Sequence, residues 1–494
     1  MQLKIEHLSF GYDGAAEAVF ADLSLSLDTS WRTGLIARNG RGKTTLLRLL
    51  TGELHGSGRI DCPLTPALFP PPIADARQTA WQVVKAAAPE SEEWRLQREL
   101  SLLHVPEETL LRPFQTLSGG EQTRALLAAL FAREDAYPLI DEPTNSLDAS
   151  GRTMLAEYLR RKDGFLLVSH DRAFLNRAID HVVCLNKANT YVMQGNYDTF
   201  EARLNGENDA EAARSETLRR EIKQLEAAAR KTAEWSRRAE DNKCHADKSY
   251  YGMVDRGFLG AGAARMMKRA QSALVRQERD IAEKQTLLRN VERVGKLRIS
   301  TLAHPQEVLM RVEDGAVYYG ARTVCEHVSF TLRQGDRLAL VGGNGCGKSS
   351  ILHALLGERD VLSGRIRLAS GLRCSVVQQR VDDLHGNLRD FIRAAQVDET
   401  LFKAILRNMD CPRAMFDHAL EELSQGQRKK ILLARSLCEP AHVFLWDEPL
   451  NYLDVFSRVQ LEELILAYQP TMLFVEHDRM FLERVATATV EICR

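Results

Sequence analysis

Apolar and polar positions alternate along the first thirty residues, as they do in half-buried β-strands. An apolar stretch, GLIA at 34–37, then precedes a glycine-rich turn and a helix-forming segment, and RLALV at 337–341 precedes a second such turn. Strand–turn–helix units of this kind predict α/β domains with a buried parallel sheet. Because the pattern occurs twice, we expect two domains of similar construction.

The segment between them has a helical periodicity instead. Apolar residues recur every three or four positions before residue 241 and every seven positions after residue 262, at Leu218, Ile222 and Leu225, and at Met267, Leu274, Ile281 and Leu288. Two antiparallel helices packed along these positions are expected. Four glycines interrupt any helix within 241–262 and predict the tip of a helical hairpin.

The two glycine-rich turns are P-loop motifs. Glycines there let backbone N–H groups surround phosphate oxygens, and the helix that follows adds its positive N-terminal dipole. The lysine of such a loop reaches the β- and γ-phosphates, and the hydroxyl of the residue that follows it is a magnesium ligand. The predicted ATP-binding residues of these loops are Asn39, Gly40, Gly42, Lys43, Thr44 and Thr45, and Gly342, Asn344, Gly345, Gly347, Lys348, Ser349 and Ser350.

Three more motifs follow each P-loop in the same order. LSGGEQ at 117–122 is repeated as LSQGQ at 423–427, LIDEP at 139–143 as LWDEP at 445–449, and SHDR at 169–172 as EHDR at 476–479. The P-loop lysine and these three motifs are separated from their copies by 305, 306, 306 and 307 residues. The chain therefore contains an internal repeat.

Each half resembles the nucleotide-binding domain of an ABC ATPase. The resemblance implies an ATP hydrolase that uses Mg²⁺, with two ATP molecules bound between the halves of a single chain. It implies catalytic roles for Glu142, Glu448, His170 and His477, and metal ligands at Thr44, Asp141, Ser349, Gln379 and Asp447. ATP held by one half would also be bound by the signature residues of the other half: Ser118, Gly119, Gly120, Ser424 and Gly426. Tyr12 and Tyr319 resemble the tyrosine that stacks on adenine, although packing in the core is an equal alternative for each.

Three positions depart from the ABC pattern. Ala37 replaces the first P-loop glycine, Pro71 stands where a Q-loop glutamine is expected, and Gln425 replaces a signature glycine. In a head-to-tail arrangement, all three belong to the composite site at Lys43. We therefore expect this site to turn over more slowly than the one at Lys348. Ser146 also departs from the usual histidine of the D-loop, with an unresolved effect.

The charge distribution adds a candidate partner. The chain has a net charge of −1, yet residues 211–300 contain 21 Lys and Arg against 13 Asp and Glu. A basic hairpin between two acidic domains suggests a polyanionic partner. No apolar run is long enough to span a bilayer, the N-terminus does not read as a signal peptide, and the nine cysteines are scattered, so we expect a cytoplasmic protein without a membrane partner.

Over essentially its whole length the chain resembles the ABC-F family. Finer motifs resemble the antibiotic-resistance branch of Lsa-like ribosomal protection proteins: WDEPLNYLDVF at 446–456, PTMLFVEHD at 470–478, and AEWSRR and ARMMKRA in the hairpin. This resemblance implies a monomer of two tandem ABC domains, 1–204 and 301–494, joined by a helical-hairpin linker at 205–300. It would bind the E site of the 70S ribosome, beside 23S rRNA and P-site tRNA, and displace antibiotics from the peptidyl-transferase centre.

The implied ribosome and drug-site contacts are at the linker tip and the helix that follows it: Tyr250, Tyr251, Met253, Phe258, Leu259, Arg265, Lys268 and Arg269. Aromatic rings beside basic residues suit folded RNA, although the tip could instead fold back as a hydrophobic cap. One alternative function is a housekeeping ABC-F translation factor without drug protection. A second, from another class, is the ATP-binding subunit of a membrane transporter. A DNA-binding ABC protein is disfavoured because the long insertions of that class are absent.

Overall fold

The computed structural model describes residues 1–12, 18–185, 190–204, 298–319, 322–343, 345–357, 362–381 and 384–492, with isolated positions between 206 and 227. Met1–Phe200 and Lys296–Arg494 form one compact unit, and Glu201–Gly295 forms another. The two sequence repeats therefore share one unit. In the other unit, the described residues at 220–224 are helical, and the predicted seam residue Ile222 is only 8% exposed.

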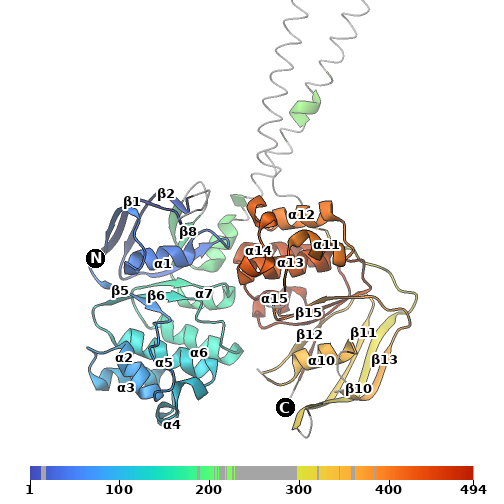
Figure 1. Ribbon diagram of the computed structural model, residues 1–494, viewed down its shortest axis with the longest axis horizontal. Helices are drawn as coiled ribbons and strands as arrows, with labels where there is room; N and C mark the ends of the chain where they lie inside the picture. The colour runs from blue at the N-terminus through green and yellow to red at the C-terminus, as the bar shows by residue number, and fades with distance from the viewer. Residues whose placement is uncertain are drawn as a thin grey trace, which may run out of the picture. The chain divides into compact units, whose positions relative to one another are not determined.

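The first half of the repeat contains two sheets (Figure 1). An antiparallel sheet has the order β2–β1–β4, with β1 at Gln2–Phe10, β2 at Phe20–Asp28 and β4 at Ser57–Asp61. The larger sheet has the order β5 (Thr65–Phe69), β6 (Ala136–Asp141), β7 (Phe165–Val168), β3 (Arg32–Ala37), β8 (His181–Leu185) and β9 (Thr190–Gln194). It is parallel except for the β8–β9 pair.

The helices of the first half are α1 (Lys43–Thr51), α2 (Ala80–Ala87), α3 (Glu93–Leu102), α4 (Glu107–Leu111), α5 (Gly119–Ala132), α6 (Ala149–Arg160) and α7 (Arg172–Ala178). The order along the chain is that of an α/β domain, with helices between the parallel strands.

The second half repeats this construction. Its antiparallel sheet has the order β11 (Arg322–Arg333), β10 (Val308–Tyr319) and β13 (Leu362–Leu368). Its parallel sheet has the order β14 (Cys374–Val377), β15 (Val443–Asp447), β16 (Met472–Val475), β12 (Arg337–Val341) and β17 (Ala488–Glu491). The helices are α10 (Lys348–Leu355), α11 (Leu388–Ala394), α12 (Glu399–Asn408), α13 (Gln425–Cys438), α14 (Val455–Tyr468) and α15 (Arg479–Val485).

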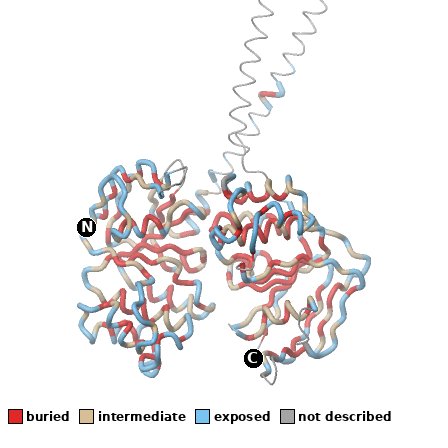
Figure 2. Tube along the Cα trace, viewed as in Figure 1, coloured by how far each residue is buried: buried red, intermediate tan, exposed pale blue. Residues whose placement is uncertain are grey.

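Burial follows the sequence pattern that predicted these strands (Figure 2). In β1 the alternating residues Leu3 and Ile5 are buried, whereas β7 and β16 are buried at every position. Continuous burial is expected for parallel strands covered on both faces. In β15, Trp446 is fully buried and its indole N–H donates to Ser436 Oγ at 2.9 Å. The predicted α/β fold with two tandem domains is confirmed.

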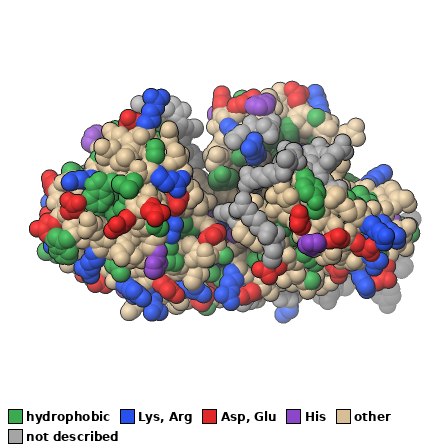
Figure 3. Space-filling model, turned by 90° about the horizontal axis from the view of Figure 1, so that it is seen from below, with side chains coloured by type: hydrophobic (Ala, Val, Ile, Leu, Met, Phe, Trp, Pro, Cys, Tyr) green, Lys and Arg blue, Asp and Glu red, His purple; other side chains and the backbone are tan. Residues whose placement is uncertain are grey.

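The described surface is mixed in charge. On the face seen in Figure 3, acidic and basic side chains are interspersed and form no large patch of one sign. Among the described residues no helix is long and apolar enough to cross a membrane. All seven cysteines in the described ranges are free thiols.

Candidate functional site

Both P-loops connect a buried strand to a helix. Gly42 and Gly347 are the N-caps of α1 and α10, with φ of 83° and 100°. A Cβ at Gly42 would lie 2.5 Å from Val19 Cγ1, and one at Gly347 would lie 2.8 Å from Val324 Cγ1. Glycine is therefore required at both positions for conformation and for space. Lys43 Nζ donates to the carbonyl of Ala37 at 2.9 Å, and Lys348 Nζ to that of Gly342 at 3.0 Å.

The predicted acidic and histidine residues lie at the carboxyl ends of the central strands. Asp141 ends β6 and Asp447 ends β15, and the glutamate after each has a positive φ, 49° at Glu142 and 46° at Glu448. Left-handed backbone at a glutamate is uncommon, and strain of this kind concentrates at functional sites.

A histidine faces each of these glutamates. His170 Nε2 is 3.3 Å from Glu142 Oε1, and His477 Nε2 is 3.7 Å from Glu448 Oε1. Burial raises the pKa of Glu142 to about 7, and burial lowers the pKa of His170 well below its usual value. Burial also lowers the pKa of His477. Both histidines are therefore neutral near pH 7 and can exchange hydrogen bonds with a glutamate and a phosphate.

The aspartates have the surroundings of cation ligands. Burial raises the pKa of both Asp141 and Asp447. Thr44 Oγ1 donates to Asp141 Oδ2 at 2.8 Å. Both carboxylate oxygens of Asp447 are buried, and the neighbouring Ser349 hydroxyl opposes the effect of burial on the pKa of Asp447. A buried carboxylate of this kind is stabilised when it binds a cation, so these residues fit the implied Mg²⁺.

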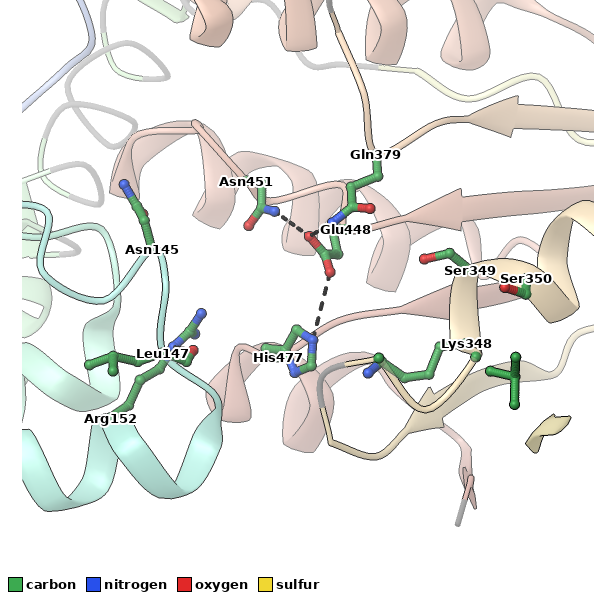
Figure 4. A pocket seen from close by; sticks show the side chains of 13 residues that line it. Asn145, Leu147, Arg152, Lys348, Ser349, Ser350, Gln379, Glu448, Asn451 and His477 are labelled. Carbon is green, nitrogen blue, oxygen red and sulfur yellow. Dashed lines mark hydrogen bonds and ion pairs between the residues drawn. The ribbon is translucent and has the colours of Figure 1, made fainter. Parts of the chain in front are cut away.

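The second P-loop borders a cavity of about 560 Å³. Lys348, Ser349 and Ser350 lie on one side of it, and Gln379, Glu448 and His477 on another (Figure 4). Three residues of the first half also line the cavity: Asn145, Leu147 and Arg152. Gln379 Nε2 donates to Glu448 Oε2 at 2.8 Å. The structure thus brings the second P-loop together with Gln379, Glu448 and His477 of its own half and with Asn145 and Leu147 of the first-half D-loop.

The first P-loop is packed directly against the second half. The Asn39 N–H donates to Asp454 Oδ2 at 3.0 Å, and Asn39 Nδ2 donates to the carbonyl of Tyr452 at 2.7 Å. A Cβ on the signature residue Gly426 would lie 2.8 Å from Asn39 Nδ2. Arg41 also pairs with Asp410 at 3.0 Å. The P-loop of each half therefore faces the D-loop of the other, and the signature of the second half lies against the first P-loop.

The signature serines begin α5 and α13. Ser118 accepts a hydrogen bond from the Glu121 N–H, and Ser424 accepts one from the Gln427 N–H, each within a capping box. The LSGGE and LSQGQ motifs therefore also set where these helices begin. Gly119 and Gly120 occupy the first turn of α5, as Gly426 does in α13. These helix N-termini present unpaired N–H groups and a positive dipole, as anion binding requires.

The departures from the ABC pattern have local explanations. Gly342 has a φ of 155°, and a Cβ there would lie 2.6 Å from the carbonyl of Ile492. Ala37, its counterpart, ends β3 without a positive φ, so alanine is accommodated. Pro71 and Gln379 each stand two residues beyond a strand end, at β5 and β14. Pro71 has no amide that could bond Glu142 as Gln379 bonds Glu448.

The remaining predicted site residues are only partly within the described part of the structure. Tyr12 is 46% exposed and its hydroxyl lies 3.0 Å from Thr45 Oγ1, which favours a surface role beside the first P-loop over packing in the core. The backbone of Tyr319 ends β10, but its side chain lies outside the described residues, as does Asn344. All the predicted contacts of the linker tip also lie outside the described residues: Tyr250, Tyr251, Met253, Phe258, Leu259, Arg265, Lys268 and Arg269.

The structure also shows a buried ion-pair network that the sequence reading missed. Arg172 on α7 is fully buried and forms an ion pair with Glu462 on α14, and its guanidinium lies 3.6 Å from Asp478. Asp478 pairs in turn with Arg458 at 3.0 Å. Arg172 comes two residues after His170, and Asp478 comes directly after His477. The network therefore links the segments that follow these two histidines. The repeated HDR motif was a signal, but it does not reveal which arginine crosses between the halves.

Two further residues at the second site were also missed. Asn451 Nδ2 donates to Glu448 Oε2, the oxygen that also accepts from Gln379. Its copy, Asn145, lines the same cavity from the first half. The recurrence of asparagine two residues after each DEP motif was available in the sequence. Lys429, by contrast, is fully buried beside β15, and its place in the basic run at 428–430 gives no sequence signal for its contacts.

Comparison with protein-family models agrees with this geometry. The ABC transporter model matches residues 20–145 and again residues 325–451, and together the two matches cover just over half of the chain. The chain therefore belongs to the ABC transporter family, as an ATPase with two copies of the ATP-binding domain.

Relatives match along nearly the whole chain. The "Ribosome protection protein VmlR" of Bacillus subtilis is 28% identical over 97% of this chain and 85% of its own length. The "ATP-binding protein Uup" of Caulobacter vibrioides is 29% identical over 97% of this chain and 75% of its length. The "Energy-dependent translational throttle protein EttA" of Haemophilus influenzae is 24% identical over 95% and 88%. The predicted ABC-F resemblance agrees with these matches.

Solved structures share the fold. The archaeal ribosome recycling factor aABCE1, in complex with the ribosomal stalk protein aP1, superimposes with a TM-score of 0.62 at 20% identity. That match covers 98% of this chain and 87% of the other. A structure described as RNase-L Inhibitor gives a TM-score of 0.59 at 20% identity, over 97% and 86% of the two chains. At this identity the likeness supports the tandem fold alone.

Proposed function

We propose that this protein is an ABC-F ATPase that binds the ribosome in its ATP-bound state and protects it from antibiotics of the peptidyl-transferase centre. The observation that carries this proposal is the match to the ribosome protection protein VmlR over 97% of the chain, hairpin region included. The ATP-binding domains supply the energy, and hydrolysis releases the protein from the ribosome. We place this activity in the cytoplasm and assign it to a monomer.

The geometry supports a division of roles within each ATP site. Lys43 and Lys348 would bind the β- and γ-phosphates, and the signature serines and glycines would bind the γ-phosphate of ATP held by the opposite half. Mg²⁺, bound by Thr44 and Asp141 or by Ser349, Gln379 and Asp447, would neutralise phosphate charge. Glu142 and Glu448 would orient and polarise the attacking water, and His170 and His477 would hold the γ-phosphate beside them.

We further propose that the two sites are unequal. In the second site, the amides of Gln379 and Asn451 hold Oε2 of Glu448, whereas no side-chain amide of the described residues donates to the carboxylate of Glu142. A general base must be oriented to act on its water. Turnover at Lys348 would therefore be faster, and ATP at Lys43 would persist longer.

The hairpin linker is the part that we assign to the ribosome. Its excess of Lys and Arg would bind rRNA phosphates, 23S rRNA and P-site tRNA being the proposed partners, and the aromatic residues of the tip would stack on exposed bases. Drug displacement would then originate at residues 241–262.

A housekeeping translation factor without drug protection is the second candidate. It is favoured by the matches to Uup and to the translational throttle EttA, which also cover 95% or more of this chain. The two candidates share the ATP sites and differ in what the linker tip does.

The test is drug susceptibility in a sensitive host that expresses the intact protein, beside a variant with residues 250–259 replaced by a short Gly/Ser turn. We expect raised resistance to lincosamides, pleuromutilins or streptogramin A that disappears with the tip. Unchanged susceptibility with both proteins, when both are expressed and hydrolyse ATP, would favour the housekeeping factor.

Ribosome binding itself needs a separate measurement. The double substitution Glu142→Gln/Glu448→Gln should trap ATP, and we expect the variant to co-sediment with 70S ribosomes at an increased yield over the wild type. Recovery of the variant with membranes instead of ribosomes would contradict the proposal and support a transporter subunit.

A further inference from the structure

Lys429 is a charged residue buried in the interior of the second half. It lies on α13, five residues after the signature serine, and its side chain is fully buried. Burial lowers the pKa of Lys429 to about 8, although the nearby carboxylates of Glu476, Asp447 and Glu448 oppose this shift. Burying an ammonium group is costly unless hydrogen bonds compensate for its lost hydration. The ammonium group of Lys429 therefore needs hydrogen-bond acceptors within the protein.

Those partners are two backbone carbonyls at the ends of neighbouring strands. Lys429 Nζ donates to the carbonyl of Gln378 at 2.8 Å and to the carbonyl of Asp447 at 3.2 Å. Gln378 follows β14, and Asp447 is the last residue of β15. These two strands are adjacent and parallel in the sheet. The ammonium group of Lys429 thus bridges the backbone at the end of β14 and the backbone at the end of β15.

The residues that follow these two carbonyls face each other. Gln379 comes directly after Gln378, and Glu448 comes directly after Asp447. Gln379 Nε2 donates to Glu448 Oε2 at 2.8 Å, and both side chains line the cavity beside Lys348 (Figure 4). Fixing the carbonyl that precedes each residue limits the peptide rotations that would turn their side chains apart.

The first half lacks both parts of this arrangement. The residue 306 positions before Lys429 is Thr123, which has no ammonium group and a much shorter side chain. The residue that corresponds to Gln379 is Pro71. The lysine and the glutamine are therefore present together in the second half and absent together from the first.

We propose that Lys429 is a positioning residue for ATP hydrolysis at the second site, because its two hydrogen bonds hold Gln379 and Glu448 in register. Lys429 is not among the residues that line the cavity beside Lys348, and it acts through the backbone that follows β14 and through the end of β15. The inference rests on the proposed roles of Gln379 and Glu448. It also adds a cause for the unequal turnover of the two sites.

The test compares Lys429→Met, which keeps the length of the side chain but loses its donors, with Lys429→Gln, which keeps one donor group. Steady-state ATP hydrolysis is measured with the full-length protein. We expect kcat to fall about 10- to 100-fold in Lys429→Met, with KM for ATP within about twofold of the wild type, since a misplaced catalytic group affects turnover rather than binding. Lys429→Gln should retain an intermediate kcat.

Thr123→Val is the matched control, because it removes a polar group at the corresponding position of the first half; kcat should be unchanged. Combining Lys429→Met with Gln379→Ala should cost less than the product of the separate losses, because both act on the same contact. Multiplicative losses, a raised KM with normal kcat, or full activity of folded Lys429→Met would overturn the inference. If Lys429→Met fails to fold by circular dichroism, the same criteria apply to Lys429→Gln.

The assignment of the site itself is checked by Gln379→Ala and Glu448→Gln alone. If both retain normal turnover, the proposed site roles fail, and Lys429 loses its basis with them. If both are impaired and both lysine variants are not, only the inference about Lys429 fails.

Discussion

The two catalytic glutamates have different neighbours although their backbone conformations match. Glu448 accepts from the amides of Gln379 and Asn451 at one oxygen, and its other oxygen faces His477. Glu142 faces His170, and Pro71 offers no donor from the Q-loop. At the scale of single residues, the two sites are therefore distinguished by how many groups orient the carboxylate.

This difference predicts unequal effects of the same substitution. Glu448→Gln should remove most of the ATPase activity, by about tenfold or more, because it disables the better-oriented base. Glu142→Gln should retain most of it. Phosphate release under saturating ATP measures both. The reverse ranking would show that the first site carries the turnover and that the departures at Ala37, Pro71 and Gln425 do not slow it.

The two halves differ in the helix contact made by Arg172 and by its counterpart Arg479. Arg172 of α7 reaches Glu462 of α14, whereas its counterpart Arg479 has a 71% exposed side chain and pairs with Glu483 on its own helix. The position that corresponds to Glu462 is Ala156, and a hollow of about 140 Å³ lies beside it. Only one of two equivalent arginines therefore crosses between the halves.

We expect Arg172→Ala to lower the free energy of unfolding by about 3–5 kcal/mol, because it leaves buried carboxylates short of a partner. Arg479→Ala is the matched control and should change it by less than about 0.5 kcal/mol, as exposed positions do. Urea denaturation at pH 7 measures both. Equal effects of the two substitutions would mean that the buried contact contributes little to stability.

The same network predicts a pH dependence. Burial disfavours the charged form of Asp478, but the charges of Arg172 and Arg458 outweigh it and lower the pKa of Asp478. The stability that Asp478 contributes is therefore present above its unfolded pKa of about 3.9 and is lost as the pH falls through the lower, folded value.

Removing Arg172 should raise that folded pKa, so the variant takes up a proton more readily in its folded state. The deficit of Arg172→Ala relative to the wild type should then shrink as the pH is lowered from 7 to 4.5. Urea titrations across this range provide the measurement, with Arg479→Ala as the pH-independent reference. A deficit that stays constant would show that Asp478 remains ionised without Arg172.

Sequence patterns were sufficient for the elements whose burial depends on local periodicity. The alternation in β1, the buried runs of β3 and β12 and the capped signature helices all follow from neighbouring residues. The P-loops, the aspartates, the glutamates and the histidines of the site were found because the motif order repeats. Lys429 and Arg172 were not, and Asn39 was predicted only as an ATP-binding residue, without its contact to the second half. The partners of all three are fixed by tertiary packing, up to 415 residues away for Asn39 and Asp454.

At the scale of the whole chain, the two ATPase halves belong to one compact unit. Contacts between them include the buried ion pair of Arg172 with Glu462 and the partly buried hydrogen bond of Asn39 with Asp454. We expect calorimetry of the wild type to show the two halves unfolding in a single transition. Arg172→Ala should separate it into two, because the coupling between the halves is then weaker. Two transitions in the wild type would contradict this expectation.

Because Arg172 pairs with the opposite half and Arg479 does not, the two halves differ in which partner each can accept. If two copies of the first half were to dimerise in the same geometry, each Arg172 would meet Ala156 in place of Glu462. Each buried guanidinium group would then keep only Asp171, the copy of Asp478, as a counter-ion. Two copies of the second half would place Glu462 opposite Arg479, which could still pair. The first half is therefore expected to pair better with the second half than with a copy of itself, so the two repeats are not interchangeable.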